Sequence, residues 1–81
     1  MALMKPITTE KAIRLMELEN KMTFLVDRRS NKTEIRREME KTFSVKVEKV
    51  STHIINNQKI ATIKLKEGSQ AIDVATKLGL I

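Results

Sequence analysis

The sequence predicts an α+β domain: a small α/β/α layered structure with a mainly antiparallel sheet of three or four strands and about three helices. Three observations lead to this class. Stretches with apolar residues at helical spacing are interleaved with stretches rich in β-branched residues that alternate every second position. Two of the β-type stretches follow one another across a short Asn-Asn turn, as the strands of an antiparallel hairpin do. With 81 residues, two glycines and one proline, the chain is expected to form one domain over residues 1–81.

The first predicted helix runs from about Thr9 to Glu19. Thr8 or Thr9 can accept the hydrogen bond of an N-cap, and Glu10 lies near the positive end of the helix dipole. The residues after this helix, Lys21 to Asp27, alternate between two faces and therefore predict a strand.

A second helix is predicted to begin at Ser30 or Asn31. Asn31 and Glu34 have the spacing of a capping box, in which each side chain accepts a hydrogen bond from the backbone of the other residue. Apolar residues then recur at intervals of four, at Ile35, Met39 and Phe43. The rest of the segment is charged, so only a narrow stripe is expected to face the core.

The predicted hairpin joins a strand over residues 44–55 to a strand over 59–66. In the first strand, Val45 and Val47 are out of phase with Val50, which predicts a bulge near residues 48–49. In the second strand, three apolar residues face one way and the intervening residues face the other. The apolar three are Ala61, Ile63 and Leu65.

Both ends of the chain carry shorter signals. A short strand over residues 3–7 would precede the first helix. A last helix is predicted to open at Gly68-Ser69 and to be capped at its C-terminus by Gly79. Its apolar stripe consists of Ala71, Val74, Ala75 and Leu78.

The composition argues against an enzyme. The chain has one histidine and no cysteine, and it lacks a Gly-rich phosphate loop and the GxSxG and HExxH motifs. We therefore expect no catalytic residue, no metal site, no cofactor and no small-molecule substrate. His53 is expected to be a partly exposed surface residue, with an RNA contact as the alternative. No apolar run is long enough for a signal peptide or a membrane span, so no membrane insertion is expected.

The positive charge indicates a polyanionic partner. The net charge is +6, and residues 21–50 carry nine basic against five acidic residues, while residues 51–66 carry three against none. Such local excess attracts nucleic acid and releases its counterions, although a simply solvated basic surface is the alternative. Only two aromatic residues are present, which disfavours a stacking platform for single-stranded bases. We therefore expect folded RNA to be bound by Arg28, Arg29, Lys32, Lys59, Lys64 and Lys66.

Several segments resemble the large-subunit ribosomal protein L23 family. The most specific is KPITTEKA at residues 5–12, followed by NKMTFLVD at 20–27, the start of the second helix, residues 43–52, and VATKLG at 74–79. The family's hairpin strand begins with two basic residues, whereas here Lys59 is followed by Ile60. Only about residues 56–58 join the hairpin strands, so the chain resembles the archaeal form with a blunt hairpin.

This resemblance implies a scaffolding protein, cytoplasmic and ribosome-bound, that contacts large-subunit ribosomal RNA and neighbouring ribosomal proteins beside the polypeptide exit tunnel. It implies that Glu10 helps to dock nascent-chain factors, with the signal recognition particle as the expected partner. It also implies RNA contacts at Lys11, Lys32, Thr52, Lys59 and Lys64. The alternative is a free-standing interaction module that adds a strand of a partner to the hairpin edge, at the β-rich segment 59–66.

Overall fold

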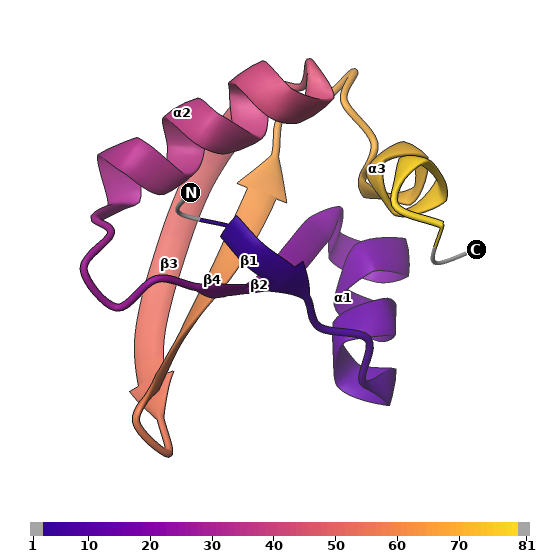
Figure 1. The fold of residues 1–81 in the computed structure, drawn as a ribbon. Coiled ribbons are helices and arrows are strands. Elements are labelled where there is room, and N and C mark those ends of the chain that lie inside the picture. Colours follow the sequence, from indigo (N-terminus) through magenta and orange to yellow (C-terminus); the bar gives the residue numbers. More distant parts are fainter. Residues whose placement is uncertain (1–2, 80–81) are drawn as a thin grey trace.

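The computed structural model describes residues 3–79, so the first two and last two residues of the expected domain lie outside the described part. Residues 3–79 form three helices and four strands, which confirms the α+β class, and their arrangement is shown in Figure 1. In chain order they are β1 (Leu3–Pro6), α1 (Glu10–Glu19), β2 (Lys21–Val26), α2 (Lys32–Phe43), β3 (Val47–Ile55), β4 (Gln58–Leu65) and α3 (Ala71–Lys77).

The strands form one antiparallel sheet in the order β1-β2-β4-β3. β4 is therefore paired on both sides, with β2 and with β3. This corrects the interpretation of segment 59–66 as an exposed edge, because its backbone groups are already used by two neighbours. The free edge of the hairpin is β3.

The hairpin turn consists of Asn56 and Asn57 alone, because Gln58 already belongs to β4. Both asparagines have left-handed backbone angles, with φ of 51° and 66°. Two successive residues at positive φ match the right-handed twist of the flanking strands, and asparagine tolerates this conformation better than most residues do. The loop is thus one residue shorter than the 56–58 connection that the sequence predicts.

Replacing Asn57 tests this turn. Asn57→Ala is expected to lower the free energy of unfolding by about 1–2 kcal/mol, because alanine is strained in the left-handed region. Asn57→Gly should change stability by less than about 0.5 kcal/mol, because glycine adopts positive φ without strain. Thermal unfolding followed by circular dichroism measures both. Equal losses in the two variants would show that the side chain, and not the backbone angle, is what the turn requires.

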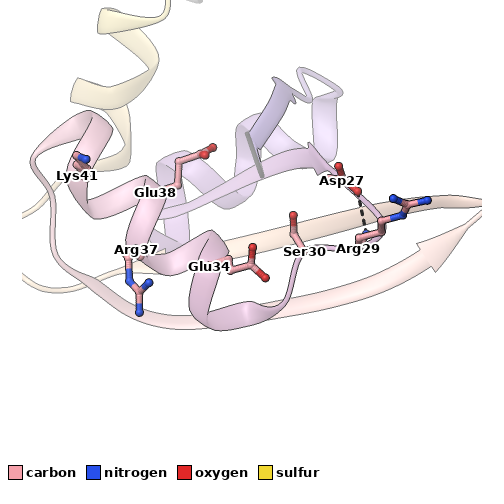
Figure 2. A pocket seen from close by; sticks show the side chains of 7 residues that line it. All are labelled: Asp27, Arg29, Ser30, Glu34, Arg37, Glu38 and Lys41. Atoms are coloured by element: carbon pink, nitrogen blue, oxygen red, sulfur yellow. Dashed lines mark hydrogen bonds between the residues drawn. The ribbon is translucent and has the colours of Figure 1, made fainter.

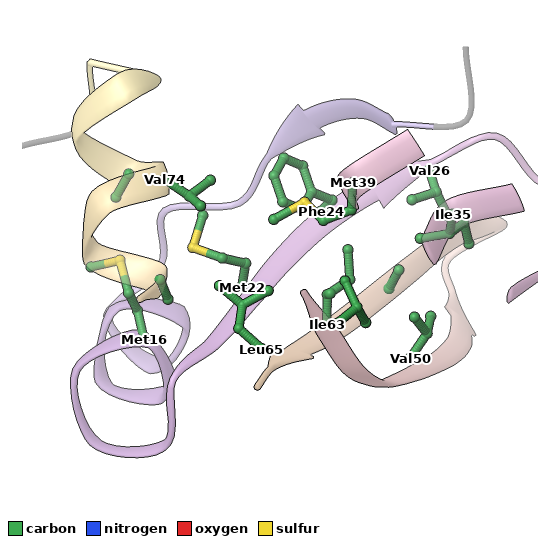
Figure 3. Packing of buried hydrophobic residues seen from close by; sticks show 14 residues of the cluster. Met16, Met22, Phe24, Val26, Ile35, Met39, Val50, Ile63, Leu65 and Val74 are labelled. Carbon is green, nitrogen blue, oxygen red and sulfur yellow. The ribbon is translucent and has the colours of Figure 1, made fainter. Parts of the chain in front are cut away.

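The core lies on one face of the sheet, under α2 and α3. Alternate residues of β2 and β4 point into it, and Ile35 and Met39 of α2 and Val74 of α3 pack against them, as Figure 3 shows. The residues from the two central strands are Met22, Phe24, Val26, Ala61, Ile63 and Leu65. The predicted alternation in β4 is therefore confirmed.

The opposite face of the sheet is bordered by α1. Ala12 and Leu15 of this helix line a hollow together with Thr23, Ile60 and Thr62, which alternate with the core residues on β2 and β4. We call this side the open face. Its residues on β2 and β4, at positions 21, 23, 25, 60, 62 and 64, are only half-buried. α2 and α3 cover the core face, and α1 borders the open face while its Met16 reaches the core cluster, so helices lie on both sides of the sheet as the predicted α/β/α layering requires.

The local signals for the starts of α1 and α2 and for the end of α3 are confirmed. Thr9 caps α1 by accepting a hydrogen bond from the backbone N–H of Ala12 at 3.2 Å. Asn31 and Glu34 form the capping box of α2, with N···O distances of 2.8 and 3.3 Å. Gly79 lies just beyond α3 with a φ of 76°, where a left-handed residue commonly follows a helix.

Two boundaries differ from the prediction by two or more residues. β3 begins at Val47 and not at Ser44, because Ser44 is the left-handed C-cap of α2, with a φ of 55°. α3 begins at Ala71, because Gly68 and Ser69 still belong to the turn after β4. The predicted bulge is confirmed, since the pairing of β3 with β4 shifts register between Val47 and Lys49.

Candidate nucleic-acid interface

Two rows of polar side chains cross the open face of the sheet. The pairing register places Lys21 opposite Lys64 and Lys64 opposite Lys49, so that three lysines from β2, β4 and β3 lie side by side. We call these three the lysine row. Two residues further along each strand, the same register aligns Thr23, Thr62 and Ser51, which we call the hydroxyl row. Together the rows place lysine, threonine and serine side chains on one side of the sheet.

The lysine row carries more positive than negative charge. Glu19 pairs with Lys21 at 3.0 Å and Glu48 pairs with Lys64 at 3.5 Å, but Lys49 has no ion pair within the described residues. Like charges directly opposite one another destabilise a sheet, and exposed ion pairs offset this only in part. A phosphate group would neutralise the excess charge. The row is therefore suited to point-charge contacts with a polyanion.

Lys11 and His53 border the same face. Lys11 is exposed on α1, and together with His53 of β3 it lines the hollow at the hairpin end of the open face. His53 is exposed, as expected of a surface residue. Of the residues predicted to contact RNA, Lys11 and Lys64 therefore lie on the open face.

A second group lies at the loop between β2 and α2. Arg28 and Arg29 are exposed in this loop, and Lys32 is exposed at the first position of α2. The Arg28 guanidinium donates a hydrogen bond to the side-chain oxygen of Asn57 at 3.2 Å, which ties the loop to the hairpin turn. This group and the lysine row lie at different ends of β2, so the basic surface is divided into two parts.

The side chain of Lys59 makes a structural contact with the loop before α2. It lies on the core face of β4, and its Nζ donates a hydrogen bond to the backbone oxygen of Ser30 at 2.5 Å. Ser30 is buried, and no other hydrogen bond to that oxygen is present among the described residues. The ammonium thus fixes the entry into α2, and it is only half-exposed for a contact with RNA.

Lys59→Met is expected to lower the free energy of unfolding by about 1–3 kcal/mol, because it leaves the buried Ser30 carbonyl without its charged donor. Methionine keeps the length of the apolar stem. Lys66→Met serves as the control, because Lys66 is exposed and its side chain makes no hydrogen bond within the described residues; its effect should stay within about 0.5 kcal/mol. Chemical denaturation measures both. Unchanged stability of the Lys59 variant would leave RNA binding as the role of this lysine.

A hollow of about 430 Å³ beside the start of α2 is a poor phosphate site. It is shown in Figure 2 and is lined by three acidic and three basic residues and one serine: Asp27, Arg29, Ser30, Glu34, Arg37, Glu38 and Lys41. The Asp27 carboxylate accepts a hydrogen bond from the backbone N–H of Arg29 at 2.9 Å (dashed in Figure 2). Because its charges balance, the hollow has no preference for an anion. Arg28 and Arg29 are therefore better placed to contact phosphates from the outer surface of the loop between β2 and α2.

The remaining predicted site residues are dispersed. Thr52 is half-buried on the core face of β3, opposite Ala61. Lys66 follows the end of β4 and is exposed. Glu10 is exposed at the start of α1 and pairs with Arg14 at 3.3 Å. Lys21 and Lys49 were not among the predicted site residues, because only the strand register places them beside Lys64.

Metal-binding clusters and membrane-spanning helices are absent from the described residues. Among residues 3–79, no three His, Cys, Asp or Glu side chains come together in a way that could hold a metal ion. Within the same residues, no helix has the length and apolar character needed to cross a membrane.

A small basic domain with lysines and hydroxyls along one open sheet face has the form of a nucleic-acid-binding protein. Comparison with known proteins identifies the family. Residues 1–68 match the family model "Ribosomal protein L23". The chain is also 46% identical over 79 residues to the large ribosomal subunit protein uL23 of the archaeon Methanothermobacter thermautotrophicus, an alignment that covers 96% of this chain and 92% of that protein. The chain belongs to the ribosomal protein L23 family, whose members are structural proteins and not enzymes.

Proposed function

We propose that this protein is a structural component of the large ribosomal subunit that binds large-subunit ribosomal RNA near the polypeptide exit tunnel. Membership of the ribosomal protein L23 family is the observation that carries the proposal. The lysine row supports it independently, because three aligned ammonium groups with two carboxylate partners form a surface that gains from contact with phosphates.

In this proposal the two basic groups hold different parts of a folded RNA. The lysine row and Lys11 contact phosphates from the open face, and Arg28, Arg29 and Lys32 contact them from the loop before α2. Rigid attachment at two places fixes the orientation of a small domain without any moving part. The protein then acts as a scaffold in the cytoplasmic ribosome, next to other ribosomal proteins.

Glu10 is proposed to belong to a docking site for nascent-chain factors such as the signal recognition particle. Its carboxylate is exposed at the first turn of α1, and its only ion pair within the described residues is the exposed one with Arg14. Such pairs contribute little to stability, so a partner can replace Arg14 at low cost. Loss of factor binding by ribosomes carrying Glu10→Gln, with subunit assembly intact, tests this role.

Sedimentation tests the main proposal. Tagged protein expressed in its own cells is expected to sediment with large subunits and to be released only by washing with concentrated salt, because phosphate contacts weaken steeply as salt rises. Recovery of the protein in ribosome-free fractions at physiological salt would contradict the proposal. Capture of a protein partner from a ribosome-depleted lysate would then favour the interaction module, with the free edge of β3 as the available strand.

A further inference from the structure

A groove of about 320 Å³ opens on the open face, between the start of α1 and the hairpin end of β3 and β4. Its apolar part comes from both sides: Ile7, Ala12 and Leu15 lie in and around α1, and Ile55 and Ile60 lie on the hairpin. Ile55 is 52% exposed, although large apolar side chains are usually covered when a neighbour is available. The groove thus presents aliphatic surface that the domain itself does not cover.

The polar groups around this groove are basic or neutral. Lys11, His53, Asn56 and Gln58 line it, and none of its lining residues is an aspartate or a glutamate. Thr23 also lines it, and its hydroxyl oxygen is buried without a hydrogen-bond partner among the described residues. Because that oxygen has no exposed surface, the polar contacts to a ligand come from the exposed side chains of Lys11, His53, Asn56 and Gln58. The occupant should therefore combine an apolar surface, hydrogen-bonding groups and negative charge.

We propose that this groove binds a single unstacked nucleotide of the RNA. The base lies against the aliphatic side chains of Ile55 and Ile60, the amides of Asn56 and Gln58 reach hydrogen-bonding groups on its edge, and Lys11 faces its phosphate. Sequence-specific recognition of RNA mostly uses bases that are turned out of a helix in this manner. The inference rests on the proposed function, since it assumes that the open face meets ribosomal RNA.

Charge and position favour a nucleotide over a peptide segment. The lysine row lies on the same face, with Lys64 two residues beyond Thr62 along β4, about 7 Å at the spacing of an extended strand. A nucleotide in the groove would thus leave its neighbours' phosphates near these ammonium groups. An extended peptide would pair with the outer edge of β3 and has no reason to seek lysines on the sheet face. No phenylalanine, tyrosine or tryptophan lines the groove, which favours one base over a stacked run.

Chemical probing of the bases tests the proposal. The full-length protein is added to large-subunit ribosomal RNA transcribed in vitro, and base reactivities are read at single-nucleotide resolution. We expect protection of one nucleotide, or two adjacent ones, that disappears with Gln58→Ala, while affinity falls roughly 5-fold, as for the loss of one modest hydrogen bond. Gln70→Ala is the matched control, because Gln70 is an exposed glutamine away from the groove whose side chain does not cap α3.

A second variant fills the groove without removing a polar contact at its rim. Thr62→Phe adds bulk on the sheet face, and aromatic residues are well tolerated in strands, so folding is expected to survive and is checked by circular dichroism. The same nucleotide should become reactive again in this variant. Unchanged protection in both groove variants would overturn the inference while leaving RNA binding intact, whereas no binding by the unaltered protein would contradict the proposed function itself.

A crosslinking experiment tests whether a protein, and not RNA, occupies the groove. A photoreactive amino acid at position 55, in protein assembled into ribosomes, should crosslink to RNA. Crosslinking to another protein in place of RNA would overturn the nucleotide assignment.

Discussion

Replacing the lysine row by glutamine, in the triple variant Lys21→Gln/Lys49→Gln/Lys64→Gln, is expected to weaken binding to large-subunit ribosomal RNA roughly 100-fold at about 0.15 M salt. Each phosphate contact releases nearly one counterion, so losing three contacts should also lower the slope of log affinity against log salt by about 2 to 3. Filter binding or fluorescence anisotropy across a salt series measures both quantities on the same preparation.

In the same triple variant, the free energy of unfolding of the domain without RNA should rise or stay unchanged. The triple variant removes three aligned like charges and two exposed ion pairs, and the first change favours the folded state while the second costs little. A control triple on α2, Arg36→Gln/Arg37→Gln/Lys41→Gln, removes the same charge from the other side of the sheet. Equal losses of affinity in the two triples would mean that net charge alone matters and that the lysine row is not a specific contact.

The parts of the fold that depend on neighbouring residues could be predicted from the sequence. The capping box of Asn31 and Glu34 needs only three residues of spacing, and the bulge near Glu48 follows from the phase of the valines on either side. Both are set by local geometry, and both are confirmed. The left-handed Ser44 could not be predicted in this way, because serine rarely adopts positive φ and the tertiary contacts decide where α2 ends.

The order of the strands in the sheet could not be predicted from local sequence patterns. The pairing of β4 with β2 joins segments about 40 residues apart, and only this pairing turns segment 59–66 from an apparent edge into a central strand. It also brings Lys21 next to Lys64. Hydrophobic alternation assigns residues to faces, but it does not determine which strands are neighbours.

The structural contact of Lys59 could have been predicted from the alternation of residues along its strand. The alternation that places Ala61, Ile63 and Leu65 on the core face also places Lys59 there, on the side opposite Lys64. A lysine on the core side at the end of a strand is well placed to donate to a backbone carbonyl, as it does to Ser30. The positive charge of Lys59 indicated an RNA contact, whereas its position on the core face of the strand already indicated a structural contact.

Asn20→Ala is expected to lower the free energy of unfolding by about 2–4 kcal/mol, the largest effect of a single substitution that we predict. Asn20 ends α1 in the left-handed conformation, with a φ of 56°. Its side-chain amide donates to the backbone oxygen of Ser69 at 2.7 Å, and its side-chain oxygen accepts from the backbone N–H of Ala71 at 2.7 Å. Alanine loses these hydrogen bonds, and the longer one from the amide to the backbone oxygen of Leu65 at 3.5 Å, and it is strained at positive φ, so the costs add.

A comparison of two glycine variants separates these costs. Asn20→Gly relieves the backbone strain but still loses the hydrogen bonds, so it should destabilise by about 1–3 kcal/mol. Ser44→Gly alters the equivalent left-handed C-cap of α2, where the serine side chain makes no hydrogen bond within the described residues, and it should stabilise by about 0.5–1 kcal/mol. Thermal melts of the two variants should therefore shift in opposite directions.

Opposite shifts at two positions with the same backbone angle would locate the contribution of Asn20 in its side chain. That side chain connects the end of α1 to the turn before α3, across some 50 residues of sequence. Its loss should therefore loosen α3 first, which hydrogen exchange of the α3 amides would detect as faster exchange than in α2. A stabilising Asn20→Gly substitution, or uniform exchange across both helices, would show that packing of Val74 and its neighbours holds α3 in place without this link.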